Sequence, residues 1–371
     1  RGDGRHGVDV AKTSVLTIDG SYGEGGGQVL RTALALSAVL DRPIELVKIR
    51  AGRRNPGLQP QHLSGVKALA EITGAEVHGA EIGSSRLYFA PERITGGSRR
   101  FDVGTAGAVS LVFQAILGPL AFADRPSTLL LTGGTHVPWS PPAPYASQVF
   151  LPMVKRMGLE ADWQLERGGF YPKGGGRVQV AVQPMTQLSS IDLTTRGALL
   201  AILGISAVAG LPAEIAKRQA DRVRCRLTDA GYTIHIEIAE IDAACPGDSL
   251  FVWVEFEQAR AGFSALGERG KPAERVADEV ADAVLDFLAG DAATEGHLAD
   301  QLALFMALAN GRSVLTTARV SRHLLTNLWT IQQFLPLGIS VEGQLGGRGR
   351  VTIDGIGLKA ASWATTTTAN A

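Results

Sequence analysis

Residues 19–37, DGSYGEGGGQVLRTALALS, decide the fold of this 371-residue chain. The apolar residues 15–18 before this stretch predict a short strand, and the glycines within residues 20–27 predict a turn. The apolar residues 28–40 then predict a helix, which is expected to end before Pro43 because proline cannot continue a helix. We therefore expect a strand, a glycine-rich turn and a helix in direct succession.

The residues that follow extend this start to a larger unit. Residues 44–49 predict a second strand, and a polar loop leads to a helix at about residues 62–72. The helix is expected to end in a turn at Gly74, before two strands that finish near Phe89. The order of elements in this first unit is βαβαββ.

The same order recurs twice along the chain. A second copy occupies residues 98–187, with a strand at 101–103 and a helix at 145–157. A third copy, with a helix at 323–335, ends near residue 357, although its first strand is not visible in the sequence. The glycine that follows the second helix of each copy is Gly74, Gly158 or Gly338, so the intervals are 84 and 180 residues. About 96 extra residues therefore lie between copies two and three, which indicates an inserted domain.

The predicted fold class is α/β in the broad sense of α+β, with two domains. Residues 188–292 combine alternating strands with amphipathic helices and predict a small inserted α+β domain. The larger domain is expected to comprise repeat 1 at about 14–97, repeat 2 at about 98–187 and repeat 3 at about 293–357. Residues 1–13 and 358–371 are low in large apolar side chains and are expected to be flexible tails.

Composition excludes several classes of protein. With 45% hydrophobic and 19% charged residues, the chain is globular rather than disordered or fibrous. Lys+Arg and Asp+Glu both total 36, so the net charge is zero and a nucleic acid would have to be held by a local basic site. No apolar run approaches membrane-spanning length and the start lacks a signal peptide, so we expect a cytoplasmic protein without a membrane partner.

The glycine-rich turn is the first candidate site. Glycines between a strand and a helix leave backbone N–H groups free to approach an anion at the positive end of the helix. The spacing matches neither GxGxxG nor the P-loop pattern, so a simple tight turn is the alternative. Glu24 would repel a phosphate unless a hard cation stood between them, which favours a metal-bridging role over simple solvent exposure.

A basic loop and three histidines complete the candidates. Arg50, Arg53 and Arg54 lie in a loop punctuated by glycine and proline, where their guanidinium groups could bind phosphate or simply be solvated. His62, His297 and His323 each fall near the start of a predicted helix, whose dipole should keep the imidazole neutral and nucleophilic. For His323, Ser321 is a candidate N-cap; a structural role is the alternative for all three histidines.

These motifs, taken together and in order, closely resemble those of the RNA 3′-terminal phosphate cyclases. The motifs that carry the resemblance are residues 19–37, 49–68 (IRAGRRNPGLQPQHLSGVKA), 104–114 (GTAGAVSLVFQ), 133–145 (GGTHVPWSPPAPY), 169–176 (GFYPKGGG), 297–302 (HLADQL) and 321–327 (SRHLLTN). The resemblance implies three βαβαββ units and a thioredoxin-like domain inserted before the third.

The resemblance also implies a reaction and its cofactors. Cyclases of this kind convert an RNA 3′-phosphate to a 2′,3′-cyclic phosphate with ATP and a divalent metal, Mg²⁺ or Mn²⁺. A histidine attacks the α-phosphorus of ATP, AMP passes to the terminal RNA phosphate, and the 2′-OH displaces AMP. Intramolecular attack by the 2′-OH restricts the partner to RNA-like ends.

Site residues carry over by motif. The resemblance makes His323 the nucleophile, places Glu24 near the metal, and assigns Arg31, Arg53 and Gln61 to phosphate or RNA-end contacts. The nucleotide-binding residues it implies are Gln114, Pro141, His297, Leu298, Ala299, Asp300 and Gln301. This chain departs from the family pattern at His297, where a tyrosine is frequent, and at Pro144, where an acidic residue is common.

Two other functions compete with this assignment. A non-catalytic cyclase-like protein of ribosome assembly would have the same fold but lack the histidine that stands at position 323. A transferase built from similar repeats would bind anions without a covalent histidine. Both alternatives are separated from the enzyme by a test for covalent adenylylation.

Overall fold

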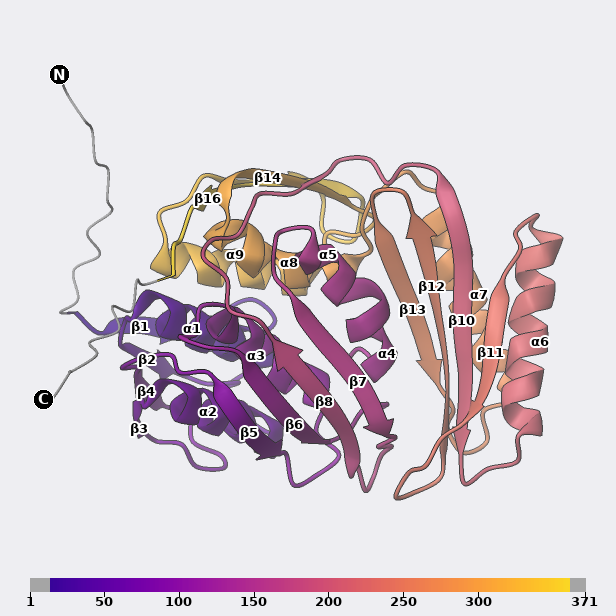
Figure 1. The fold of residues 1–371 in the computed structure, drawn as a ribbon, viewed down its shortest axis with the longest axis horizontal. Coiled ribbons are helices and arrows are strands. Elements are labelled where there is room, and N and C mark those ends of the chain that lie inside the picture. The colour runs from indigo at the N-terminus through magenta and orange to yellow at the C-terminus, as the bar shows by residue number, and fades with distance from the viewer. Residues whose placement is uncertain (1–13, 361–371) are drawn as a thin grey trace, which may run out of the picture.

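A computed structural model describes residues 14–360 as four four-stranded sheets and the helices that cover them. Figure 1 shows that helices α8 and α9 lie beneath the sheet of β14 and β16 and face α1 and α3. The fold is mixed α and β, which confirms the predicted class.

The first sheet has the strand order β1-β2-β4-β3, in which β1 and β2 are parallel and the other pairs are antiparallel. Its elements are β1 (Leu16–Asp19), α1 (Gly27–Leu40), β2 (Ile44–Val47), α2 (Pro60–Thr73), β3 (Glu76–His78) and β4 (Leu87–Ala90). Helix α1 ends at Asp41 and helix α2 at Gly74, both in the left-handed conformation that commonly closes a helix.

The second sheet repeats this order and these directions as β5-β6-β8-β7. Its elements are β5 (Gly97–Asp102), α3 (Val109–Ala121), β6 (Ser127–Gly133), α4 (Ala143–Tyr145), the π-helix η1 (Ala146–Phe150), α5 (Leu151–Lys155), β7 (Ala161–Arg167) and β8 (Gly176–Val182). The helix expected over residues 145–157 is thus interrupted by a π-turn. Pro152 has no N–H to donate within the helix, and the carbonyl of Gln148 accepts from Arg260 instead.

A third sheet has the same order, β9-β14-β16-β15, with β9 and β14 parallel. Its elements are β9 (Asp192–Leu193), α8 (Gly296–Leu308), β14 (Asn310–Thr317), α9 (Arg322–Phe334), β15 (Ile339–Gly343) and β16 (Gly349–Ile356). Strand β9 lies inside residues 188–292, which were expected to form the inserted domain. It nevertheless pairs with β14 of this third sheet. A two-residue strand has no periodicity by which to recognise it.

The fourth sheet, β11-β10-β12-β13, is covered by α6 and α7, which also pack on each other. Its elements are β10 (Leu199–Ala209), α6 (Glu214–Asp229), β11 (His235–Glu240), β12 (Gly247–Phe256), β13 (Arg260–Leu266) and α7 (Ala273–Leu288). A separate hydrophobic cluster fills the space between this sheet and its helices. The division of the chain into two domains stays a prediction.

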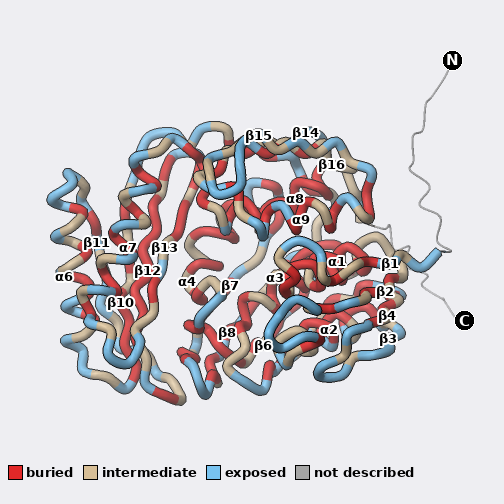
Figure 2. Tube along the Cα trace, turned by 180° about the vertical axis from the view of Figure 1, so that it is seen from behind, coloured by how far each residue is buried: buried red, intermediate tan, exposed pale blue. Residues whose placement is uncertain are grey.

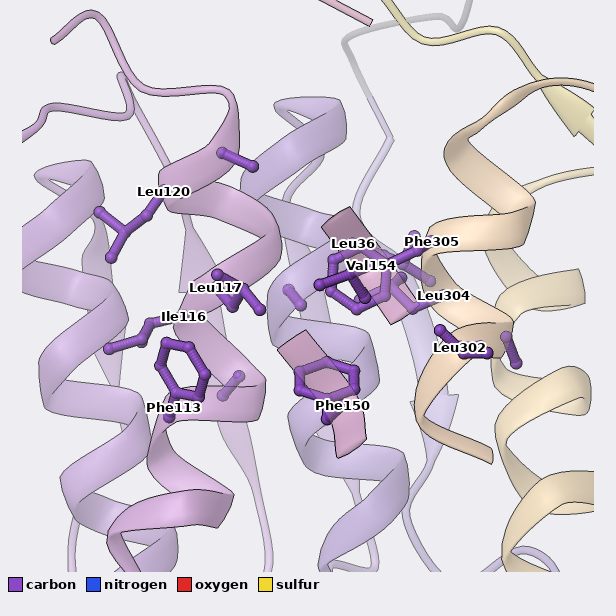
Figure 3. Packing of buried hydrophobic residues seen from close by; sticks show 14 of the residues in the cluster. Leu36, Phe113, Ile116, Leu117, Leu120, Phe150, Val154, Leu302, Leu304 and Phe305 are labelled. Atoms are coloured by element: carbon purple, nitrogen blue, oxygen red, sulfur yellow. The ribbon is translucent and has the colours of Figure 1, made fainter. Parts of the chain in front are cut away.

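The main hydrophobic core lies among the helices of the first three sheets. Figure 3 shows Phe113 and Leu117 of α3, Phe150 of η1 and Phe305 of α8 packed together, and Figure 2 shows the central helices as mostly buried. Helix pairs α1–α3, α1–α9 and α8–α9 are in contact. This packing fixes the N-terminal ends of several helices relative to one another.

The chain near residue 358 differs from the expectation of a flexible tail. The backbone N–H of Leu358 donates to Leu308, and that of Ala360 donates to Thr186. Residues 358–360 are therefore held against the fold, while the predicted tails at 1–13 and 361–371 lie outside the described residues. Within the described part, no helix is both long and apolar enough to cross a membrane.

Candidate active site

The glycine-rich turn wraps onto the first turns of α9. Gly23 and Gly25 adopt left-handed backbone conformations, and a Cβ on Gly23 would lie 2.2 Å from the hydroxyl of Thr326. That hydroxyl accepts from the backbone N–H of Glu24 at 3.3 Å. Glycine at position 23 thus allows the turn to approach α9 and to present the Glu24 carboxylate to it.

One carboxylate oxygen of Glu24 joins the turn to a histidine and an arginine. Glu24 Oε2 lies 3.0 Å from His323 Nε2 and 3.3 Å from Arg53 Nη2. Glu24 is only 10% exposed, whereas His323 is 50% exposed. Burial raises the pKa of Glu24, but the hydrogen bond from His323 and the charges of His323, Arg53 and Arg31 outweigh it and lower that pKa.

His323 stands in the first turn of α9, as predicted. Ser321 caps this helix, because its Oγ accepts from the backbone N–H of Leu324 at 3.0 Å. The hydrogen bond to Glu24 raises the pKa of His323 above its ordinary value, with burial opposing. The carboxylate at 3.0 Å thus acts on this ring in the opposite direction to the helix dipole, which disfavours the imidazolium form.

Arg31 of α1 is the next side chain that acts on Glu24. It is mostly buried, its Nη2 donates to Gln28 Oε1 at 2.7 Å, and its Nε has no hydrogen-bond partner within residues 14–360. Burial lowers its pKa, and the charges of Asp300 and Glu24 oppose that effect. An unsatisfied guanidinium N–H beside Glu24 and Asp300 is suited to an incoming anion.

The N-terminal end of α2 meets those of α1 and α3. His62 Nδ1 accepts from the backbone N–H of Gln59, and a Cβ on Gly27 would lie 2.6 Å from His62 Nε2. Burial, with the charges of Arg31 and Arg50, lowers the pKa of His62 to about 3, so this ring is neutral at pH 7. Gln61 Oε1 accepts from the backbone N–H of Ala108 at 3.1 Å, just before α3.

The nucleotide-binding segment expected at residues 297–301 forms the first turns of α8. His297 is exposed, while the side chains of Leu298 and Ala299 are fully buried in the core. Asp300 is buried, and Asn327 of α9 donates to its Oδ1 at 3.0 Å and to its backbone oxygen at 2.8 Å. Burial raises the pKa of Asp300 to about 6.

Three of the expected residues line one small hollow between α1, α3 and α8. Gln114, Gln301 and Arg31 all contribute to its wall. Pro141 lies near the N-terminal end of α3, since its carbonyl accepts from Ser110 Oγ at 2.9 Å. The residues expected to bind the nucleotide and phosphate, and the expected nucleophile, thus lie around the N-terminal ends of α1, α2, α3, α8 and α9, where the helix dipoles favour an anion.

Sequence reasoning missed two residues that shape the site. Glu295 caps α8 by accepting from the backbone N–H groups of His297 and Leu298 at 2.6 and 2.9 Å, and it also accepts a hydrogen bond from Tyr145. Glutamate is not one of the usual N-cap residues, but acidic residues are enriched near the first turn of a helix, and that weaker signal could have identified Glu295. The contact with Tyr145, 150 positions away, cannot be predicted from the sequence pattern.

Known proteins match this chain over most of its length. A family model described as RNA 3′-terminal phosphate cyclase matches residues 22–341. The chain belongs to the RNA 3′-terminal phosphate cyclase family. Curated cyclases of that name include one from Pyrobaculum neutrophilum, 44% identical with 92% of this chain and 99% of the relative covered, and one from Methylococcus capsulatus, 45% identical with 92% and 97% covered.

EPSP synthase from Acinetobacter baumannii matches 94% of this chain and 66% of its own, at 12% identity and a TM-score of 0.25. A likeness of that size carries no argument about the fold or activity of this cyclase-family chain.

Proposed function

We propose that this cyclase-family chain converts RNA 3′-phosphate ends to 2′,3′-cyclic phosphates with ATP, through a covalent His323–AMP intermediate. The observation that supports this most is the half-exposed His323 ring, 3.0 Å from Glu24 at the start of α9. Arg31 and Arg53 flank the same carboxylate. A nucleophile, a proton acceptor and two anion-binding side chains are thus in one place.

ATP would lie across the meeting point of the helix ends. Arg31, Arg53 and the free backbone N–H groups of α9 are suited to the triphosphate, because each offers a donor or positive partial charge. Gln114, Pro141, His297 and Gln301 are proposed to hold the nucleoside. Leu298, Ala299 and Asp300 would contribute through the helix they build, since their side chains are buried.

Glu24 is proposed to prepare the nucleophile. The raised pKa of His323 favours the imidazolium form in the free protein. Nε2 must lose its proton to gain a lone pair, and Glu24 Oε2 lies 3.0 Å away to accept it. Nε2 then attacks the α-phosphorus of ATP; the N–P bond forms as the bond to pyrophosphate breaks, and Nδ1 keeps its proton.

Two transfers would complete the reaction. An oxygen of the RNA 3′-phosphate attacks the phosphorus of His323–AMP, which frees the histidine and leaves AMP joined to the RNA end. The neighbouring 2′-OH then attacks the 3′-phosphorus and expels AMP, closing the cyclic phosphate. Arg53 and Gln61 are proposed to orient that end, because an intramolecular attack depends on position.

The site fits a divalent cation only together with substrate phosphates. No group of three or more His, Cys, Asp or Glu side chains suited to a metal occurs in residues 14–360. Mg²⁺ is commonly held by one or two carboxylates plus phosphates and water, and Glu24 can supply one such ligand. When bound, Mg²⁺ or Mn²⁺ would neutralise charge on the triphosphate.

Covalent labelling tests the proposal. Incubation with α-labelled ATP and Mg²⁺ should leave label on the wild-type protein through a bond that acid cleaves and base does not, as expected of a phosphoramidate. His323→Ala should reduce labelling by at least about 10³-fold, because no other nucleophile replaces the ring. His78→Ala is the matched control, since His78 is also an exposed histidine paired with a glutamate.

Loss of label only in His323→Ala supports the enzyme. A wild-type chain that takes up no label but binds RNA would instead favour the non-catalytic cyclase-like role.

A further inference from the structure

Two aromatic side chains project from the surface in the loops that follow β6 and β7. Trp139 is 98% exposed and Tyr171 is 71% exposed. Neither residue is used by the reaction proposed above. Trp139 lies in the loop between β6 and α4, and Tyr171 in the loop between β7 and β8.

Trp139 contributes almost nothing to folding. Its side chain buries nearly none of its surface within the chain, and its backbone φ of 66° is in the left-handed region that L side chains rarely adopt. An exposed tryptophan held in this conformation gains no burial that would offset the strain. Its large apolar face is therefore free for a ligand.

The two loops are joined through a rigid base. His136 and Phe170 form a parallel β-bridge and their rings stack at 5.2 Å, while both are buried. The backbone N–H groups of Thr135 and His136 donate to Gly169 at 2.9 and 3.1 Å. Trp139 and Tyr171 thus extend from one fixed support rather than from separate mobile loops.

This support is attached to the N-terminal end of α3. Ala108 and Gly134 form a β-bridge, and Ser110 donates to the carbonyl of Pro141, so the tryptophan loop is anchored on both sides. A Cβ on Gly174 would lie 2.5 Å from the carbonyl oxygen of Thr105, which shows that the tyrosine loop rests on the turn before α3.

The same end of α3 holds Gln61, through its hydrogen bond to the Ala108 backbone N–H. Gln61 is proposed to contact the RNA end, so the aromatic residues lie next to the point where the strand would leave the site. Lys173, two residues after Tyr171, is exposed and adds a positive charge for the phosphate backbone.

We propose that Trp139 and Tyr171 form a stacking platform for bases of single-stranded RNA upstream of the reacting 3′ end. Aromatic side chains stack on unpaired bases of any sequence, and a neighbouring cation binds the backbone. A duplex would hide the base faces, so the platform selects single-stranded ends. The inference rests on the proposed cyclase function, because it requires an RNA end at His323.

The test compares substrates of two lengths. For a ten-nucleotide single-stranded RNA with a 3′-phosphate, Trp139→Ala and Tyr171→Ala should each raise the KM for cyclisation about tenfold. A 3′-phosphorylated dinucleotide is too short to reach the platform, and its KM should change less than about twofold. Trp139→Phe should keep most of the wild-type affinity, since phenylalanine still stacks.

Two further measurements separate the possible failures. Labelling of His323 by ATP without RNA should be unchanged in Trp139→Ala; a raised KM for ATP there would put Trp139 in the nucleotide site and overturn the proposal. Anisotropy of the labelled ten-nucleotide RNA without ATP should show the same loss of affinity, and unchanged binding would also overturn it. Leu200→Ala, at a 63% exposed leucine on β10, is the matched control.

If the cyclase proposal itself were wrong, the wild-type chain would neither take up label nor cyclise either RNA, which distinguishes that failure from failure of the stacking platform.

Discussion

Glu24 raises the pKa of the candidate nucleophile, His323. A single carboxylate oxygen lies within 3.3 Å of both His323 Nε2 and Arg53 Nη2. Arg53 and Arg31 both bring positive charge to this carboxylate, which suits a site for phosphates. The hydrogen bond and charge of the same carboxylate raise the pKa of His323.

Glu24→Gln should therefore lower the pKa of His323. The hydrogen bond and charge that raise this pKa are lost with the carboxylate, so the ring becomes neutral at a lower pH. The acidic limb of the pH profile for His323 labelling should move to lower pH, and the plateau rate should fall about 10²-fold because the proton acceptor is gone. NMR titration of the His323 ring measures the pKa directly.

Glu76→Gln is the control, because Glu76 pairs with the exposed His78 at 2.8 Å. It should leave both the titration of His323 and the labelling rate as in wild type. An unmoved acidic limb in Glu24→Gln would remove Glu24 from this role.

At the scale of elements, a buried polar network ties α1, α8 and α9 together. Asn327 of α9 donates to Asp300 of α8, and its Oδ1 accepts from Thr32 of α1 at 2.6 Å. Gln28 donates to the same threonine at 3.2 Å. A satisfied network of this kind fixes the relative position of the three helix ends that carry the site.

Asp300→Asn should stabilise the protein at neutral pH. Burial raises the pKa of Asp300 from 3.8 to about 6, so the folded chain binds this proton more tightly than the unfolded chain does. As pH rises from about 4 to about 6, the free energy of unfolding of the wild type falls, by up to about 3 kcal/mol. Asparagine keeps an acceptor for Asn327 and removes that loss.

Denaturant unfolding at pH 7.5 and pH 4 checks the sign: the variant should be more stable than wild type at pH 7.5 and nearly equal to it at pH 4. For Asp354→Asn we expect the opposite sign, a lower stability than wild type at pH 7.5, because the hydrogen bond from Arg312 lowers the pKa of Asp354. Equal stability of Asp300→Asn and wild type at both pH values would contradict the buried-carboxyl account.

The periodic elements could be predicted from the sequence, and the short or polar ones could not. Helix α9 was expected at 323–335 and runs Arg322–Phe334, because apolar residues recur along one face between a serine cap and a glycine turn. Strand β5 was expected at 101–103 but runs Gly97–Asp102, since the two arginines before Phe101 give no apolar alternation. Strand β9 has only two residues, too few for any pattern.

At the scale of the whole molecule, the site depends on contacts that join distant segments. The family motifs identify His323, Glu24 and Arg53 separately. The pair of Glu24 with His323 joins residues 299 positions apart, and that of Glu24 with Arg53 joins residues 29 positions apart. No sequence pattern encodes the effect of Glu24 on the histidine pKa, because that effect depends on a 3.0 Å distance set by packing.

The fourth sheet also reaches the site through packing. Its residues Phe251 and Trp253 belong to the main core, and the ring of Phe251 lies edge-on to Tyr145. Tyr145 in turn donates to Glu295, the cap of α8. This fourth sheet therefore supports the helix end that is proposed to bind the nucleotide.

Gly262→Ala tests this long-range support. A Cβ at position 262 on β13 would lie 2.9 Å from both the Tyr145 ring and Val149, closer than carbon atoms pack. Overpacking of this kind costs about 1–3 kcal/mol, and displacing Tyr145 should weaken its hydrogen bond to Glu295. We expect a lower free energy of unfolding together with a several-fold higher KM for ATP in His323 labelling.

Gly65→Ala on α2 is the matched control, because a Cβ there meets no atom within 4 Å. Alanine within a helix should raise stability by up to about 1 kcal/mol and leave the KM for ATP unchanged. If Gly262→Ala lost stability while its KM for ATP stayed at the wild-type value, the sheet would stabilise the fold without supporting the nucleotide end of α8. Only a combined loss connects β13, through Tyr145 and Glu295, to the first turn of that helix.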